Sequence, residues 1–146
     1  MRTLLRISAI LAVGAGVVLV AGSVWAVLFT YRTVAREGIV TPPDAVLPLA
    51  PVRGPLTLHA QAEAIRKHTL EMTGGKTYAE MPRQVEKTDS QGQPVRVPNT
   101  ARDIWVTATT LITALHLAII TYLFSGLLLL FGIVSLWTGL VFYRLS

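Results

Sequence analysis

The chain has 146 residues, of which 52% are hydrophobic and only 14% are charged, and its formal net charge is +5. Soluble domains carry about a quarter charged residues, so this composition argues against an ordinary soluble domain. The basic excess does not indicate a nucleic-acid partner, because the sequence has no basic stripe and no interleaving of basic and aromatic residues. The chain has no cysteine, which excludes disulfides, thiolate metal sites and cysteine nucleophiles.

The charged residues divide the chain into an apolar segment, a polar middle and a second apolar segment. All acidic residues lie between Glu37 and Asp103, and only three of the 13 basic residues lie outside 32–102. We therefore expect an all-α membrane protein, in which two transmembrane helices form an antiparallel hairpin and are joined by a Pro-rich, partly helical loop. Membrane lipid is then an expected partner, and the basic excess fits anionic lipid.

The first apolar segment follows a short tail at residues 1–6 and is expected to be a membrane anchor. Residues 7–31 form a run of 25 residues without a charge. A helix needs about 20 apolar residues to cross the hydrocarbon core. The run is longer than the roughly 7–15 apolar residues of a signal peptide, so we expect a retained anchor rather than a cleaved signal.

The loop at 32–103 is expected to begin with an extended arm and a helix. Five prolines fall within 41–55, which favours polyproline II conformation. Residues 57–73 have a helical pattern with Thr57 as a possible N-cap, and Gly74-Gly75 is expected to end this helix. The loop has few large apolar residues, so we expect it to rest on the membrane surface or on a partner protein.

The second half of the loop is expected to hold a short turn and a polar stretch. The sequence Thr77-Tyr78-Ala79-Glu80 has the pattern of a capping box, which opens a helical turn at 77–81 that Pro82 stops. Residues 83–99 are polar and form either an irregular loop or a weak hairpin. In the hairpin alternative the paired residues are Val85, Val95 and Val97.

The second apolar segment is too long for a single membrane crossing. Residues 104–143 carry no charge, and a helix of that length extends about 60 Å, beyond the roughly 40–45 Å of a bilayer. Residues 104–116 place apolar side chains on one face and Thr and His side chains on the other, which predicts an amphipathic helix at or beyond the membrane surface. We expect residues 117–143 to span the membrane before a tail at 144–146. No Gly or Pro separates the two parts, so they can form one continuous helix.

Small residues follow one face of each apolar segment, which predicts close packing between helices. The residues predicted to pack are Ser8, Ala12, Ala15, Gly22 and Ala26 in the first segment, and Thr121, Ser125, Gly132, Ser135 and Gly139 in the second. They fit a helix hairpin or docking onto a partner helix, although Gly and Ala are also common in membrane helices generally.

The basic residues also bear on orientation. Those near the termini favour cytoplasmic ends, whereas those flanking the loop favour the reverse. A loop longer than about 60 residues partly escapes the positive-inside count. We therefore expect a two-pass protein of a bacterial cell membrane, with cytoplasmic termini and an extracytoplasmic loop.

His116 is the strongest candidate for a functional side chain. An ionisable residue at the edge of a membrane helix is a functional hypothesis by default. The alternatives are a structural hydrogen bond to Thr109 or Thr113, a contact with a partner, or ligation of a haem or pigment. His59 and His68 fit a solvated helix face better than a shared metal site, and no metal site is expected. No catalytic set of Ser, His and Asp or of paired carboxylates is suggested, so we expect no catalytic residues and no small-molecule substrate.

The stretch GPLTLHAQAEAIRKHTLEMTGGKTYAE at 54–80 resembles a family of small bacterial, chiefly actinobacterial, membrane proteins. These have two helices, a Pro-rich approach and the elements AQA, KH and TGGKTYAE. The resemblance is close over 54–80 and extends elsewhere to the layout alone. Some members are labelled aromatic ring-opening dioxygenases, and the family implies no established function. Non-haem iron dioxygenases need two His and a carboxylate on one metal. His59 and His68 point in opposite directions on a helix, so we do not expect the label to apply.

These patterns favour a non-catalytic accessory or scaffolding subunit of a larger membrane complex, of the respiratory or oxidative kind. Other integral membrane subunits are its expected partners, and its cofactor is unknown. Contacts with a partner are expected from Leu58, Ile65, Met72, Tyr78, Thr109 and Thr113. Two alternatives stay open: a subunit that binds haem or a pigment through His116, and a small membrane-anchored enzyme or binding module that acts through the loop.

Overall fold

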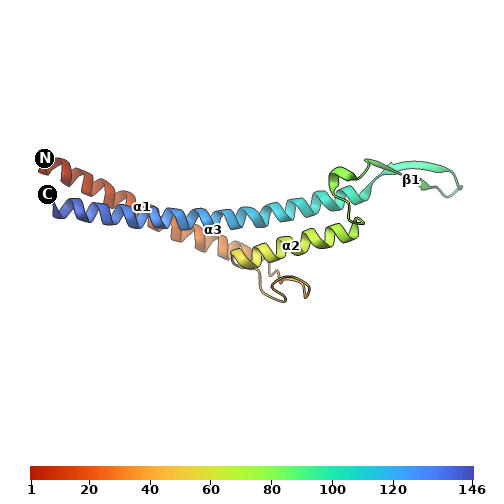
Figure 1. Cartoon of the computed structure of the whole chain (residues 1–146), viewed down its shortest axis with the longest axis horizontal. Helices are drawn as coiled ribbons and strands as arrows, with labels where there is room; N and C mark the ends of the chain where they lie inside the picture. Colours follow the sequence, from red (N-terminus) through yellow and green to blue (C-terminus); the bar gives the residue numbers. More distant parts are fainter. The chain divides into compact units, whose positions relative to one another are not determined.

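The computed structural model describes all residues, 1–146, as three α-helices, one 3₁₀ turn and a two-stranded antiparallel sheet (Figure 1). In chain order the elements are α1 (Arg2–Arg36), α2 (Pro55–Met72), η1 (Tyr78–Glu80), β1 (Gln84–Thr88), β2 (Pro94–Pro98) and α3 (Thr100–Arg144). The chain is mostly helical, as expected, but the two strands correct the expectation of an all-α chain.

The residues group into two compact units. The helix-pair unit consists of Met1–Ile39, Arg53–Pro55 and Ala118–Ser146. The polar unit consists of Val40–Val52 and Leu56–Leu117. The last helix belongs to both, because α3 runs without interruption from Thr100 to Arg144. The part of α3 in the polar unit ends at Leu117, whereas the sequence predicted that the amphipathic part would end at His116.

In the helix-pair unit, α1 lies beside the second part of α3, and the two run in opposite directions (Figure 1). The backbones approach closely because the residues between them are small. The hydroxyl of Ser23 donates a hydrogen bond to the Ser125 carbonyl at 2.7 Å. The hydroxyl of Ser135 donates to the Ala12 carbonyl at 2.8 Å. A Cβ atom at Gly132 would lie 2.7 Å from a methyl carbon of Val20, so only glycine fits there without a shift.

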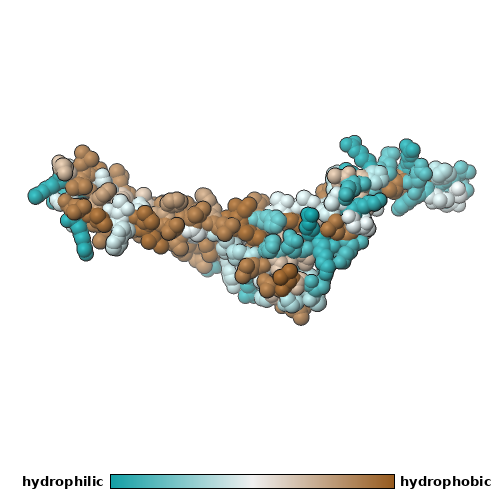
Figure 2. All heavy atoms as spheres, in the orientation of Figure 1, coloured by the Kyte–Doolittle hydropathy of each residue, from teal (hydrophilic) through white to brown (hydrophobic).

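Both α1 and α3 are long and apolar enough to cross a membrane, as judged by length and composition. Only 11% of the most apolar 18-residue window of each helix is buried within the chain. A core helix of a soluble protein would instead be mostly buried. On the face shown in Figure 2, hydrophobic residues predominate along this unit.

In the polar unit, α2 lies beside the first part of α3 (Figure 1). The buried side chains come from the stretch before α2, from α2 itself, from the residue after η1 and from the first part of α3. Those with the largest apolar side chains are Val52, Leu58, Met81 and Trp105. Small residues of α2, among them Ala60, Ala62 and Ala64, are buried as well. This unit therefore has a small core of the kind found in soluble proteins.

The Pro-rich stretch forms a closed loop, and the prediction of an extended arm over 41–55 is wrong. Thr41 is 1% exposed, and its side chain makes hydrogen bonds to backbone groups of the same loop. Its hydroxyl donates to the carbonyl of Leu47 and accepts from the Ala50 N–H at 2.8 Å. A bridge between Val40 and Pro51 closes the base of the loop. Proline restricts its own φ and suits tight turns as well as extended chain, so composition alone did not distinguish the two.

Helix α2 begins at Pro55, earlier than expected, so Thr57 lies inside the helix and is not its N-cap. Proline fits the first turn because that N–H has no partner within the helix. The predicted end at Gly74-Gly75 is confirmed. Gly75 donates to the Leu70 carbonyl at 2.7 Å and Gly74 to the Glu71 carbonyl at 3.3 Å, and both glycines have positive φ. These are the two hydrogen bonds of a Schellman motif.

Residues 83–99 form a hairpin, the alternative to the irregular loop. Strands β1 and β2 pair with Val85 opposite Val97 and Lys87 opposite Val95. The turn is organised by Asp89, whose carboxylate accepts hydrogen bonds from the backbone N–H groups of Gln91 and Gln93, each at 2.8 Å. Side-chain capping of this kind favours turns, although it is not a strong hairpin signal. The valines alone alternate too briefly to have distinguished a hairpin from a loop.

Asn99 connects the hairpin to α3. Its side-chain amide donates to the Pro82 carbonyl at 2.9 Å, and its side-chain oxygen accepts from the Ala101 N–H at 3.1 Å. The second bond satisfies a donor of the first helical turn, as an N-cap does. The helix therefore starts at Thr100, four residues before the predicted 104.

Candidate functional site

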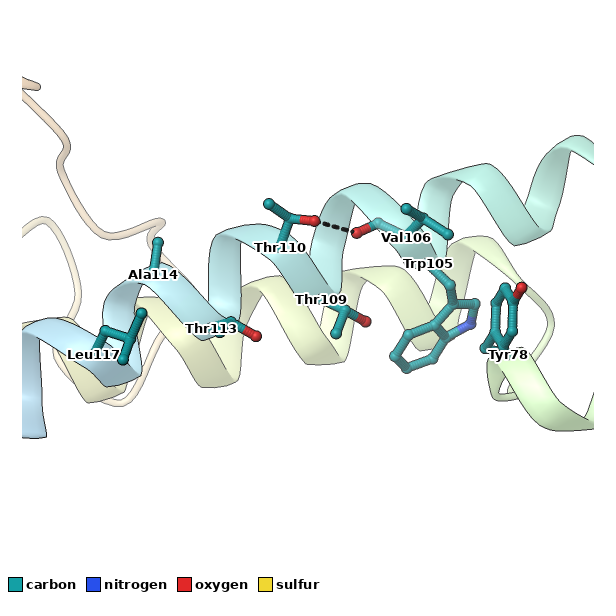
Figure 3. Close-up of a pocket in the computed structure, with 8 residues that line it drawn as sticks. All are labelled: Tyr78, Trp105, Val106, Thr109, Thr110, Thr113, Ala114 and Leu117. Atoms are coloured by element: carbon teal, nitrogen blue, oxygen red, sulfur yellow. Dashed lines mark hydrogen bonds between the residues drawn. The ribbon is translucent and has the colours of Figure 1, made fainter.

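A groove of about 620 Å³ runs along the first part of α3 in the polar unit (Figure 3). Most of its lining is apolar, with tyrosine and threonine hydroxyls at intervals. The lining residues are Tyr78, Trp105, Val106, Thr109, Thr110, Thr113, Ala114 and Leu117. All belong to α3 except Tyr78, which comes from η1. An apolar groove with few polar groups is the usual form of a binding site in proteins.

Trp105 is held firmly at one end of the groove. Its side chain is 6% exposed. The indole N–H donates to the Lys76 carbonyl at 2.8 Å and lies 3.2 Å from the Thr73 hydroxyl oxygen. The glycines that end α2 turn the chain so that the Lys76 carbonyl is available for this bond. A buried indole N–H needs such an acceptor.

Tyr78 forms a wall of the groove and is fixed from behind. The Arg102 guanidinium lies 3.8 Å from the centre of the Tyr78 ring, a cation–π contact. The same guanidinium donates to the Tyr78 carbonyl at 3.1 Å and to the Met81 carbonyl at 2.6 Å. The predicted capping box is present, with the Thr77 N–H bound to the Glu80 carboxylate at 2.7 Å. That bond, with one from the Thr77 hydroxyl, lowers the pKa of Glu80.

Two threonine hydroxyls of the groove make no hydrogen bond within the chain. Thr110 donates to the Val106 carbonyl at 2.9 Å, as helical threonines commonly do (Figure 3). Thr109 and Thr113, one turn apart on α3, are exposed and have no such bond. They offer free polar groups at the edge of an apolar surface.

Of the residues predicted to contact a partner, some lie in the groove and others do not. Tyr78, Thr109 and Thr113 lie together in the groove. Met72 is 66% exposed but lies elsewhere, and Ile65 is half-buried. The prediction for Leu58 is wrong, because its side chain is fully buried inside the polar unit. A helical apolar stripe does not reveal which members face the chain's own core. Trp105 was not predicted as a groove residue, because the pattern over 104–116 indicated only a general apolar face.

The predicted helix-packing residues of α3 lie against α1: Ser125, Gly132 and Gly139 are buried and Ser135 is half-buried. On α1 the prediction is only partly right. Ala12 accepts a hydrogen bond through its carbonyl, and Ser8 and Ala26 are half-buried, but Ala15 and Gly22 are exposed. The buried residues of α1 are Ala9, Gly16, Ser23 and Thr30. They repeat every seven residues and lie on a face of α1 next to the predicted one. Both faces carry small residues, so the presence of small residues did not indicate which face packs against α3.

His116 is exposed and makes no hydrogen bond within the chain. Thr109 and Thr113, the expected structural partners, do not bind it. The internal hydrogen bond expected of His116 is therefore not formed.

His68 has a partner that the sequence did not suggest. Its Nε2 lies 2.9 Å from a carboxylate oxygen of Asp44, and the Lys67 ammonium lies 2.7 Å from the same oxygen. The hydrogen bonds from Lys67 and then His68 lower the pKa of Asp44 from 3.8 to about 2, and the first raises the pKa of Lys67. Asp44 comes from the closed loop at 41–50 and the other two from α2, so no sequence spacing linked them. His59 has no such partner.

A second cluster lies at the loop end of the helix-pair unit. The Tyr122 hydroxyl donates to the Arg53 carbonyl at 2.8 Å. The Arg53 guanidinium donates to the Tyr31 hydroxyl at 3.4 Å. Arg53 therefore joins α1 to α3 at the end of their contact, a role that its position in the Pro-rich stretch did not indicate.

No group of three or more His, Cys, Asp or Glu side chains is placed to hold a metal ion. In comparisons with known proteins, no family model, no curated protein and no solved structure matches this chain.

Proposed function

We propose that the chain is a two-pass membrane protein that acts as a non-catalytic accessory subunit, with the groove beside Trp105 as its docking surface for another subunit. The observation that carries the proposal is the combination of an apolar groove and the free hydroxyls of Thr109 and Thr113 within it. A subunit that fills the groove would remove apolar surface from water and give both hydroxyls an acceptor.

The membrane part of the proposal rests on the surface of the helix pair. Its large apolar side chains point outward, with Leu123 63% exposed and Phe131 61% exposed. Its contact is made by small residues and two serine hydroxyls. Helices in lipid associate in this way, since lipid offers no hydrophobic drive between them. We propose that the pair forms a transmembrane hairpin of a bacterial cell membrane, with cytoplasmic termini.

Proximity labelling from the groove tests the docking proposal. A photo-crosslinking amino acid at Thr113 should capture a discrete membrane protein in cells. The matched control places the same amino acid at Gln91, in the hairpin turn of the same unit, and should capture much less. Mass spectrometry of the captured band, and of material purified in mild detergent, would identify the complex. Recovery of the chain without any stoichiometric partner, together with equal labelling from both positions, would overturn the proposal.

A second candidate is a subunit that binds a haem or pigment through His116, because this side chain is exposed and has no partner within the chain. An imidazole is a common axial ligand of haem. The candidate requires a visible absorption band in the purified complex that His116→Ala removes and His59→Ala retains. An unchanged band in both variants would exclude it.

A further inference from the structure

The arginines of the helix-pair unit gather at its two ends. The unit contains Arg2, Arg6, Arg32, Arg36, Arg53 and Arg144, no lysine, and Glu37 as its one acidic residue. The three arginines on the loop side belong to the end of α1 and to the segment at 53–55. Arginine is the side chain best suited to phosphate, because its planar guanidinium makes paired hydrogen bonds with two phosphate oxygens.

Two of these arginines continue an aromatic stripe on the outer face of α1. Trp25 and Phe29 are stacked, with ring centroids 5.4 Å apart, and are 67% and 57% exposed. At about 100° per residue, Trp25, Phe29, Arg32 and Arg36 lie roughly 200–260° around the helix from the buried Thr30. The stripe therefore faces away from α3, toward whatever surrounds the pair.

The order of side chains along this stripe matches the order of groups in a phospholipid. The stacked rings come first, and the two guanidiniums follow one and two turns nearer the loop. Aromatic rings favour the depth of the membrane interface, and arginines there extend toward the headgroups. Both arginines are exposed and neither has an ion pair within the chain. Tyr31 and the Arg53 guanidinium, joined at 3.4 Å, lie at the same end.

We infer that the stripe Trp25–Phe29–Arg32–Arg36 is a binding site for one anionic phospholipid. The acyl chain lies along the two rings, and the two guanidiniums, one helical turn apart, hold the phosphate. The negative headgroup selects anionic lipid over the zwitterionic kind, because a bound zwitterion brings its own cation close to the arginines. This inference rests on the membrane insertion proposed above but not on any partner subunit.

Native mass spectrometry of the full-length protein in detergent tests the site directly. The probes are phosphatidylglycerol and phosphatidylcholine with the same acyl chains. We expect wild-type protein to keep phosphatidylglycerol with about tenfold preference, and the double variant R32Q/R36Q to lose that preference. The matched control R83Q/R96Q removes the same charge from the hairpin and should retain it. Equal preference in R32Q/R36Q and wild type, or equal loss in the control, would overturn the site.

Two further arms separate the sources of failure. Millimolar inorganic phosphate should leave the preference intact, and its abolition would mean that the site holds a free anion rather than a lipid. Flotation with phosphatidylcholine vesicles after alkaline extraction reports insertion without regard to headgroup. Failure to float would overturn the proposed membrane function, whereas flotation without headgroup preference would overturn the lipid site alone.

A fluorescence measurement avoids substitution of the arginines. In vesicles that mix the two lipids, brominated phosphatidylglycerol should quench Trp25 more than brominated phosphatidylcholine at the same mole fraction. The contribution of Trp25 is the difference between wild type and W25F, which leaves Trp105 and Trp137 in place. Equal quenching by the two lipids would contradict the inference.

Discussion

The two units of this chain bury opposite kinds of residue. In the helix-pair unit the buried positions of α1 hold Ala, Gly, Ser and Thr, and the large apolar side chains are outside. In the polar unit Val52, Leu58 and Trp105 are inside and charged residues are outside. Burial follows the solvent: water expels large apolar groups, whereas lipid accepts them and leaves close backbone packing as the source of contact. One continuous helix, α3, obeys both rules along its length.

The strongest test of this contrast replaces tryptophans in the two units. Trp105→Ala removes a buried side chain and its two hydrogen-bonding contacts, and should destabilise the polar unit by about 3–5 kcal/mol. Trp137→Ala, at a residue 71% exposed in the helix-pair unit, should leave the polar unit unchanged. Hydrogen exchange of the amides at 73–81, measured by mass spectrometry, reports the difference. Equal protection in the two variants would show that Trp105 is not a core residue.

The next test concerns the close approach of the helices. Gly132→Leu places side-chain atoms where a Cβ already lies 2.7 Å from Val20, so the helices must separate. Gly22→Leu adds the same side chain where nothing lies within 4 Å. The expected cost at Gly132 is about 1–3 kcal/mol, as for overpacking generally.

A disulfide reports this separation. The chain has no native cysteine, so the pair Ala12→Cys and Ser135→Cys gives an unambiguous signal. Bond formation should fall strongly with Gly132→Leu and persist with Gly22→Leu. Persistence with both would argue that the two helices do not pack as described.

A smaller effect is expected from the buried serine. Ser23→Ala removes the donor to the Ser125 carbonyl, which remains partly satisfied as an ordinary helical acceptor. Hydrogen bonds between membrane helices contribute about 0.6 kcal/mol on average, so we expect a loss of roughly that size. Thr138→Ala, whose hydroxyl bonds only within its own helix, is the matched control. Steric-trap unfolding in bicelles measures both variants.

The smallest effect belongs to the exposed Asp44 cluster. The pKa of Asp44 is lowered from 3.8 to about 2, so its ion pairs contribute fully above pH 3.8. Their contribution is lost as the pH falls from 3.8 toward 2. The effect is small because surface pairs are screened by solvent. Wild type should therefore lose stability across this range relative to Asp44→Asn, as followed by thermal unfolding. Parallel pH profiles would contradict the assignment.

Sequence reasoning worked best where one signal acts alone. Three predictions depended only on neighbouring residues, and the structure has all three features. They are the long apolar helices, the end of α2 at its glycines and the capping box at Thr77. It failed where a residue far away decides the outcome. Thr41 closes a loop that its prolines did not define, Asp44 binds side chains more than 20 positions away, and Leu58 is covered by its own unit. Small-residue stripes predicted close packing, but the face of α1 used depends on what α3 presents.

The hairpin has a consequence for self-association. The backbone N–H of Asn99 donates to the Arg83 carbonyl, and the backbone N–H of Asp89 donates to the Gln93 carbonyl. Each of these bonds joins directly opposite residues of the hairpin. Bonded pairs in an antiparallel ladder alternate with unbonded ones, so residues 94, 96 and 98 turn their nitrogens outward. Two of these are Pro94 and Pro98, which have no N–H. The free edge of β2 thus displays a single donor, at Arg96, and makes a poor template for another strand. Another strand could therefore pair only with the free edge of β1.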